Sequence, residues 1–192
     1  MGSSEDKNPV MSTTTAAAIA PAVTDREIRF AAFVADHREQ AVRMAWRLTG
    51  GDQATAEEVA QEAFLRAHRA LGRFREEAQL STWFYRILVR QAANYRRWRG
   101  VRQFWSGAFR EDAPDPRPAP RGDPAPRGRI ETAMDQLSPK QRSVFTLVHL
   151  EGFTVEETAE IVGCATGTAK SHLHRALTSL RTELAPLREE GR

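Results

Sequence analysis

The sequence predicts an all-α protein made of two small helical domains joined by a proline-rich linker. Apolar residues recur at three- and four-residue steps over most of the chain, and no segment alternates apolar and polar residues with period two. Six of the ten prolines fall between Pro114 and Pro126, where they oppose a packed helix. A chain of 192 residues has room for one or two small cores. We expect domains at residues 25–99 and 130–185, a linker at 100–129, and tails at 1–24 and 186–192.

The tail and the linker are predicted from composition. Residues 1–24 are rich in Ser, Thr, Ala and Pro in low-complexity order, which is typical of a disordered segment. The prolines of the linker favour an extended, semi-rigid chain that permits the two domains to lie apart. Phe104, Trp105 and Phe109 precede these prolines and have two explanations: they cap the first domain, or they dock on a partner protein.

Three helices are expected in the first domain. The first runs from Asp25 to Leu48 and ends at Gly50, because glycine accepts the left-handed conformation that terminates a helix. Its predicted buried stripe comprises Ile28, Ala31, Ala35, Val42, Ala45 and Leu48. The second helix covers residues 55–71. The third is capped by Ser81 or Thr82 and runs to about residue 99.

Charge is segregated along these helices, although the net charge of the whole chain is only +3. Residues 52–65 carry four carboxylates and neither Lys nor Arg, whereas residues 81–110 carry seven arginines and no carboxylate. Such segregation indicates two different partners, one basic and one acidic. The alternative explanation of the acidic helix is that its carboxylates simply face solvent and bind no partner.

The second domain begins with two helices. Residues 130–137 form a short one. Ser138 and Gln141 then make a capping box, and Pro139 occupies the first helical position, where its missing N–H costs nothing. The helix that follows runs to about Leu150.

The end of the chain has the pattern of a helix-turn-helix. Thr154 and Glu157 form a capping box, Gly163 lies at the turn, and a longer helix follows to about Leu184. Between Ile161 and Thr182 there is no carboxylate, so the second helix is cationic. A short Gly-containing turn between two helices, the second cationic, is typical of insertion into the DNA major groove.

Three segments together resemble the extracytoplasmic-function (group 4) sigma factors of the sigma-70 family. Ala56–Arg66 resembles the acidic helix of region 2 that binds core RNA polymerase. Phe74–Ile87 resembles the loop and helix that recognise the −10 element. Residues 137–142 with Gly163–Ala176 resemble region 4, which recognises the −35 element. The resemblance covers roughly residues 25–99 and 130–185.

The resemblance implies three groups of site residues. Core polymerase would be bound by Glu57, Glu58, Gln61 and Glu62. The −10 element would be bound by Arg73, Arg75, Gln79, Trp83, Arg86, Arg90, Asn94 and Arg97. The −35 element would be bound by Thr166, Thr168, Lys170, Ser171, His172, His174 and Arg175. Asn94 departs from the family pattern, since many relatives carry an acid before the arginine run.

The resemblance also implies the partners: core RNA polymerase, promoter DNA and an anti-sigma factor. We expect a cytoplasmic protein, since Cys164 is the single cysteine and no run approaches the roughly 18 apolar residues of a membrane helix. No catalytic motif is present, so no enzyme activity, cofactor or metal site is expected. The alternative is a stand-alone helix-turn-helix regulator that acts without polymerase.

Overall fold

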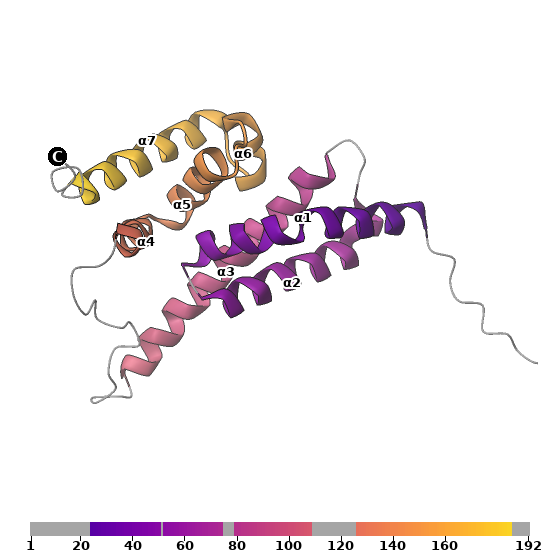
Figure 1. The fold of residues 1–192 in the computed structure, drawn as a ribbon, viewed down its shortest axis with the longest axis horizontal. Coiled ribbons are helices and arrows are strands. Elements are labelled where there is room, and N and C mark those ends of the chain that lie inside the picture. The colour runs from indigo at the N-terminus through magenta and orange to yellow at the C-terminus, as the bar shows by residue number, and fades with distance from the viewer. Residues whose placement is uncertain (1–23, 51, 75–78, 109–125, 186–192) are drawn as a thin grey trace, which may run out of the picture.

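The computed structural model is all-helical over the residues it describes, which are 24–50, 52–74, 79–108 and 126–185, excluding the side chains of 102–108 and 126–127. The first domain contains α1 (Asp25–Thr49), α2 (Gln53–Ala70), a 3₁₀ turn η1 (Leu71–Arg73) and α3 (Leu80–Ala108). The second contains α4 (Pro126–Gln136), α5 (Pro139–Phe145), a π-helical turn η2 (Thr146–Leu150), α6 (Val155–Val162) and α7 (Thr166–Glu183). Figure 1 shows α1, α2 and α3 side by side, with α4–α7 grouped along one side of them. The predicted fold class is confirmed.

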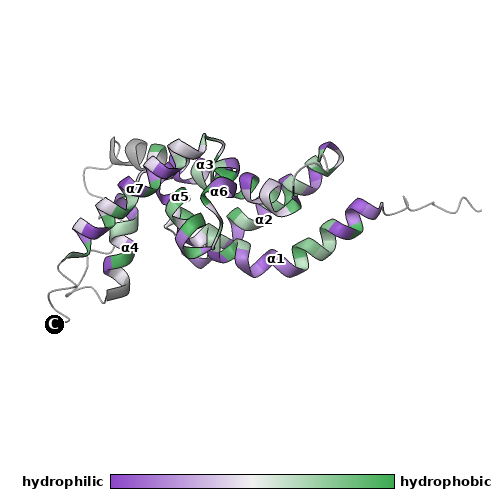
Figure 2. Cartoon of the chain, turned by 90° about the horizontal axis from the view of Figure 1, so that it is seen from above, coloured by the Kyte–Doolittle hydropathy of each residue, from purple (hydrophilic) through white to green (hydrophobic). Residues whose placement is uncertain are grey.

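The core of the first domain is aromatic at one end and built from small residues in its middle. Phe33 packs edge-on against Phe84, and Phe64 stacks on Phe84 with ring centroids 4.3 Å apart. Four buried alanines of α2 let α1 and α3 approach it closely: Ala56, Ala60, Ala63 and Ala67. Figure 2 shows hydrophilic and hydrophobic residues alternating along the helices, as expected of helices with one buried side.

The predicted stripe of the first helix is wrong in its N-terminal half. Ile28 is 58% exposed, and Ala31 and Ala35 are also exposed. The buried residues there are Phe30 and Phe33, which lie about 200° around the helix from Ile28 and Ala31. Both rows have helical spacing, so periodicity alone does not separate them. The larger aromatic surface is buried because it removes more apolar area from water.

Helix α3 differs from its predicted bounds at both ends. It begins at Leu80, before the expected caps, and it continues past Gly100 to Ala108, into the stretch assigned to the linker. One glycine costs a helix only about 1 kcal/mol, so Gly100 does not end it. In the same way α4 starts at Pro126, four residues before its predicted start, because proline is tolerated in a first turn.

The second domain has a smaller core of its own. Ala133, Met134 and Leu137 of the α4 segment pack against Ala176 and Leu180 of α7. Both predicted capping boxes are confirmed, the first at Ser138 with Gln141 and the second at Thr154 with Glu157. Gly163 has φ 74° and Gly50 has φ 60°, so each ends its helix in the left-handed conformation as predicted.

The two domains pack against each other. Leu147 and Ile161 of the second domain belong to the core cluster of the first and are at most 1% exposed. At the end of α1, Arg142 of α5 donates from Nη1 to the carbonyl oxygen of Arg47 at 3.4 Å. A Cβ on Gly50 would overlap the Asp135 carboxylate and the Arg142 guanidinium, so only glycine fits at this approach. The linker composition permits separation, but this conformation is compact.

Candidate nucleic-acid and partner-binding surfaces

The solvent-facing side of α7 carries a row of polar side chains in its first half. Thr168, Lys170, Ser171, His174 and Arg175 are exposed, while Ala169 and Ala176 on the opposite side are fully buried. The buried side fixes the helix on α4 and α5, and the exposed side is left to contact another molecule. Its residue types can hydrogen-bond to base edges and phosphates.

Two predicted residues of this group are less accessible. Thr166 is half-buried in the first turn of α7. His172 is also half-buried, and its Nδ1 atom is buried with no hydrogen-bond partner among the described residues. The structure therefore separates His172 from the exposed row.

The N-terminus of α7 differs from that of α6. Thr154 caps α6 by accepting from the Glu157 amide at 3.1 Å, and the Glu157 carboxylate accepts in return. These hydrogen bonds lower the pKa of Glu157. At α7 the N-cap is Ala165, which provides no side-chain hydrogen bond. The first amides of α7 thus lack a side-chain acceptor and can face a phosphate oxygen.

Helix α3 carries the predicted arginine stripe on the surface of the first domain. Arg90 and Arg97 are exposed, and Arg97 donates to the Asn94 side chain at 3.1 Å. Asn94 is half-buried and orients this arginine. Arg86, the first of the row, is half-buried, and its Nε donates to the Glu160 carbonyl oxygen of α6 at 3.0 Å.

The loop before α3 is described only in part. Arg73 and Gln79 are exposed at its two ends, whereas Arg75 lies outside the described residues. Trp83 is half-buried against Phe74, with ring centroids 5.0 Å apart, so its ring contributes to packing. Trp98, farther along α3, is 65% exposed and has a face available for stacking.

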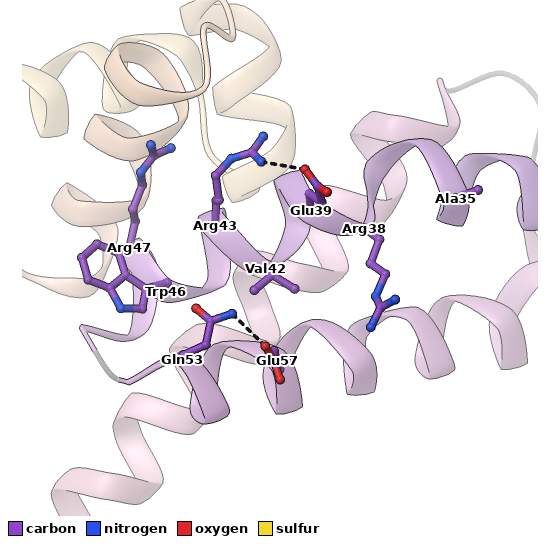
Figure 3. Close-up of a pocket in the computed structure, with 9 residues that line it drawn as sticks. All are labelled: Ala35, Arg38, Glu39, Val42, Arg43, Trp46, Arg47, Gln53 and Glu57. Carbon is purple, nitrogen blue, oxygen red and sulfur yellow. Dashed lines mark hydrogen bonds and ion pairs between the residues drawn. The ribbon is translucent and has the colours of Figure 1, made fainter.

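The acidic face of α2 borders a groove. Glu57, Glu58 and Gln61 are exposed, while Glu62 is half-buried and pairs with Arg66 at 2.7 Å. Figure 3 shows the groove between this helix and α1, where Glu57 accepts from the Gln53 amide at 2.7 Å. The α1 side is lined by Ala35, Arg38, Glu39, Val42, Arg43, Trp46 and Arg47.

The sequence interpretation missed the α1 half of this groove. Trp46 is 36% exposed on it, and the arginines alternate with apolar residues beside the buried stripe. The sequence did contain one signal for this surface, because Trp46 lies outside the apolar row, on a face of the helix that is otherwise polar. The surface therefore joins arginines with an exposed aromatic ring, and both residue types are enriched in protein interfaces.

The described residues contain no cluster of His, Cys, Asp or Glu suited to a metal ion. Nor does any helix in the described part of the chain combine the length and apolarity that crossing a bilayer requires.

Comparisons with known proteins identify both domains. The sigma-70 region 2 model matches residues 33–101 and the sigma-70 region 4 model matches residues 127–180. The RNA polymerase sigma-H factor of Pseudomonas aeruginosa is 34% identical over 152 residues, which is 73% of this chain and 78% of the relative. The ECF RNA polymerase sigma-E factor of Escherichia coli K12 is 32% identical over 142 residues, covering 68% and 74%.

The fold also matches a solved structure. The sigma factor RpoE from Bartonella quintana, solved in complex with the anti-sigma factor NepR, superposes with a TM-score of 0.64 at 28% identity. The match covers 82% of this chain and 97% of that one.

Proposed function

Because the chain belongs to the extracytoplasmic-function sigma factors of the sigma-70 family, we propose that it binds core RNA polymerase and directs it to promoters through their −35 and −10 elements. It is an alternative sigma factor for transcription initiation. The observation that carries the promoter-specific part of the proposal is the exposed polar row on the first half of α7.

The second domain would bind the −35 duplex through α7. Lys170 and Arg175 are exposed and carry donors suited to guanine O6 and N7 in the major groove. Ser171 and His174 extend the same surface. The amides at the start of α7, with the Thr166 and Thr168 hydroxyls, would hold a phosphate and fix the helix in register.

The first domain would bind the −10 element. Arg90 and Arg97 would neutralise phosphates, and each neutralised phosphate releases counterions and raises affinity. Arg73 and Gln79, with Arg75, would contact bases of the opened strand from the loop before α3. Binding the opened strand more tightly than the duplex shifts the equilibrium toward melting without chemical catalysis. Trp83 would stabilise the start of this loop by packing against Phe74.

Core polymerase would bind the acidic face of α2 and the adjoining groove. Glu57, Glu58 and Gln61 are exposed there, and the groove provides Trp46 as an aromatic contact. Charged residues at the rim of such a surface mainly steer association and select the partner. Glu62 would act partly through its ion pair with Arg66.

Regulation and location follow from the same assignment. Since the RpoE relative is held by an anti-sigma factor, we infer that an anti-sigma factor also binds this chain, and that both act in the cytoplasm with the polymerase. The division into a region 2 domain, a linker and a region 4 domain belongs to this proposal. A stand-alone regulator would need no polymerase-binding surface, and the region 2 match disfavours it.

Run-off transcription tests the proposal. Core polymerase is incubated with a pool of random promoter templates, with and without the full chain. We expect initiation only when both proteins are present, and start sites that share two upstream motifs. Sequence-specific footprints by the chain alone, without core-dependent initiation, would instead establish the stand-alone regulator.

A further inference from the structure

Glu151 is a carboxylate of the second domain buried in the first. Its side chain is 4% exposed, and Arg47 of α1 donates to Oε1 while the Gln40 amide donates to Oε2 at 3.2 Å. Burying a carboxylate is costly unless its oxygens receive hydrogen bonds, and here both oxygens receive them from α1. In Figure 3 the Arg47 side chain leaves α1 toward the ribbon of the second domain.

A hydrogen bond from α3 orients the socket on α1. The Tyr85 hydroxyl donates to Gln40 Oε1 at 2.7 Å, which turns the amide nitrogen of Gln40 toward Glu151. Burial raises the pKa of Tyr85, and the Glu151 carboxylate raises it further, so this hydroxyl keeps its proton. The socket is thus a set of three side chains from α1 and α3 arranged around a carboxylate.

The backbone of the second domain presents Glu151 to this socket. The π-helical turn η2 places the Glu151 amide on the Thr146 carbonyl at 3.0 Å, and such turns are rare and often mark functional positions. Gly152 then reverses the chain with φ 77°. Phe153 follows and packs edge-on against Tyr85, with ring centroids 5.3 Å apart.

This docking covers part of the candidate −10 surface. Ile161 of α6 is buried in the core of the first domain, and the neighbouring Glu160 carbonyl accepts from Arg86. Arg86 is half-buried, and its Nε is engaged by the backbone of α6 while α6 lies on α3, which leaves fewer of its donors for a phosphate.

We propose that the free chain closes on itself, with the Glu151 loop docked between Gln40 and Arg47 and with α6 covering Arg86. The role of Arg86 rests on the proposed function, whereas the closed state rests on the contacts alone. The contact combines the apolar side chains of Leu147 and Ile161 with the buried Glu151–Arg47 ion pair. The ion pair regains its hydration when the domains separate, which favours a reversible contact. Opening would release Arg86 from α6, whereas the exposed row of α7 is accessible in both states.

Distance measurement tests the closed state. Nitroxide labels are placed at the exposed Arg69 of α2 and Thr178 of α7, in a Cys164→Ser background, and measured by electron–electron double resonance. The doubly labelled protein with no further substitution, called the parent below, is expected to give one narrow distance distribution. Glu151→Lys, which faces Arg47 with a like charge, should shift most of the population to longer, broader distances.

Two variants control this result. Glu156→Lys makes the same charge change at an exposed site of α6 and should keep the narrow distribution. Arg47→Glu combined with Glu151→Lys restores opposite charges and should recover much of it. A narrow distribution in Glu151→Lys, or a broad one in the parent, would overturn the closed state.

A transcription assay tests whether closure lowers the activity of the chain. With limiting chain, core polymerase and no other protein, Glu151→Lys should raise initiation about threefold or more, since a larger fraction is competent to bind. Open distances without this rise would overturn the masking role. If no variant supports initiation with core, the proposed function fails, and the distance distributions still decide whether the chain closes.

Discussion

Arg142 is 1% exposed, whereas Asp135, the carboxylate that accepts from its Nη2, is 53% exposed. Burial lowers the pKa of Arg142, and the Asp135 carboxylate opposes this effect. The pair is therefore asymmetric, because only the cation has lost its water. Its position against Gly50 and the Arg47 carbonyl places this charge at the junction of the two domains.

Asp135 should contribute more to stability than is usual for a residue that is half exposed. Asp135→Asn leaves the buried guanidinium without a counter-ion, so we expect the free energy of unfolding to fall by about 3 kcal/mol. Glu131→Gln, an exposed site on the same helix, should change it by less than about 0.5 kcal/mol. Urea denaturation followed by circular dichroism measures both. Equal, small effects would show that Arg142 needs no partner.

The turn between α6 and α7 provides a matched pair of glycines. Gly163 has positive φ with no atom near its missing Cβ, so Gly163→Ala should cost about 1–2 kcal/mol through backbone strain alone. Gly167 lies within α7 with equally open space, and Gly167→Ala should be neutral or stabilising by up to about 1 kcal/mol. Thermal unfolding distinguishes them, and a neutral Gly163→Ala would contradict the left-handed turn.

The capping box of α6 should make stability depend on pH in a defined direction. The folded-state pKa of Glu157 lies below 4.5, so its contribution is present above pH 4.5 and is lost as the pH falls through the lower value. Glu157→Gln keeps a capping side chain without the titration. The melting temperature of the parent should therefore exceed that of the variant near pH 7, and the difference should shrink below pH 4.5. A constant difference would contradict the assignment.

DNA binding should depend on the N-terminal half of α7. Lys170→Ala and Arg175→Ala should each weaken binding to a −35 duplex about tenfold, since a specific base contact contributes about 1–3 kcal/mol. Arg181→Ala removes the same charge from the last turn of α7 and should change affinity less than about twofold. Fluorescence anisotropy at fixed salt measures all three. Equal losses would indicate general charge attraction instead of base recognition.

Polymerase binding should depend on the acidic face of α2. Glu58 is exposed with its charge on this face, and Glu58→Lys should weaken binding to core polymerase about fivefold or more through like-charge contact. Glu183→Lys makes the same change at the exposed end of α7. Competition for core polymerase measures both, and unaltered binding by Glu58→Lys would place the contact elsewhere.

Local sequence signals predicted local structure well. Thr154 with Glu157, Ser138 with Gln141, and Gly163 each satisfy or relieve backbone groups within one turn, so their patterns are visible in a single stretch. The polar row of α7 was predictable for the same reason, because its buried and exposed sides alternate within one helix.

Contacts between residues far apart in the sequence could not be predicted from local patterns. Arg142 and Glu151 are charged residues that sequence patterns assign to the surface, yet each is buried by partners about a hundred residues away or in another helix. The stripe of α1 was misplaced because Phe33 and Ala31 belong to rows of equal periodicity, and the packing of Phe33 on Phe84 selects between them. Closure of the two domains is a property of these contacts.

Permanganate footprinting of a promoter found by run-off transcription tests whether the chain and core polymerase open the −10 element together, because permanganate reacts with unpaired thymines. We expect reactive thymines near the −10 element only when core polymerase and the chain are both present, with the −35 duplex protected in the same complex. Protection of duplex DNA by the chain alone, with no reactive thymines when core is added, would contradict this expectation.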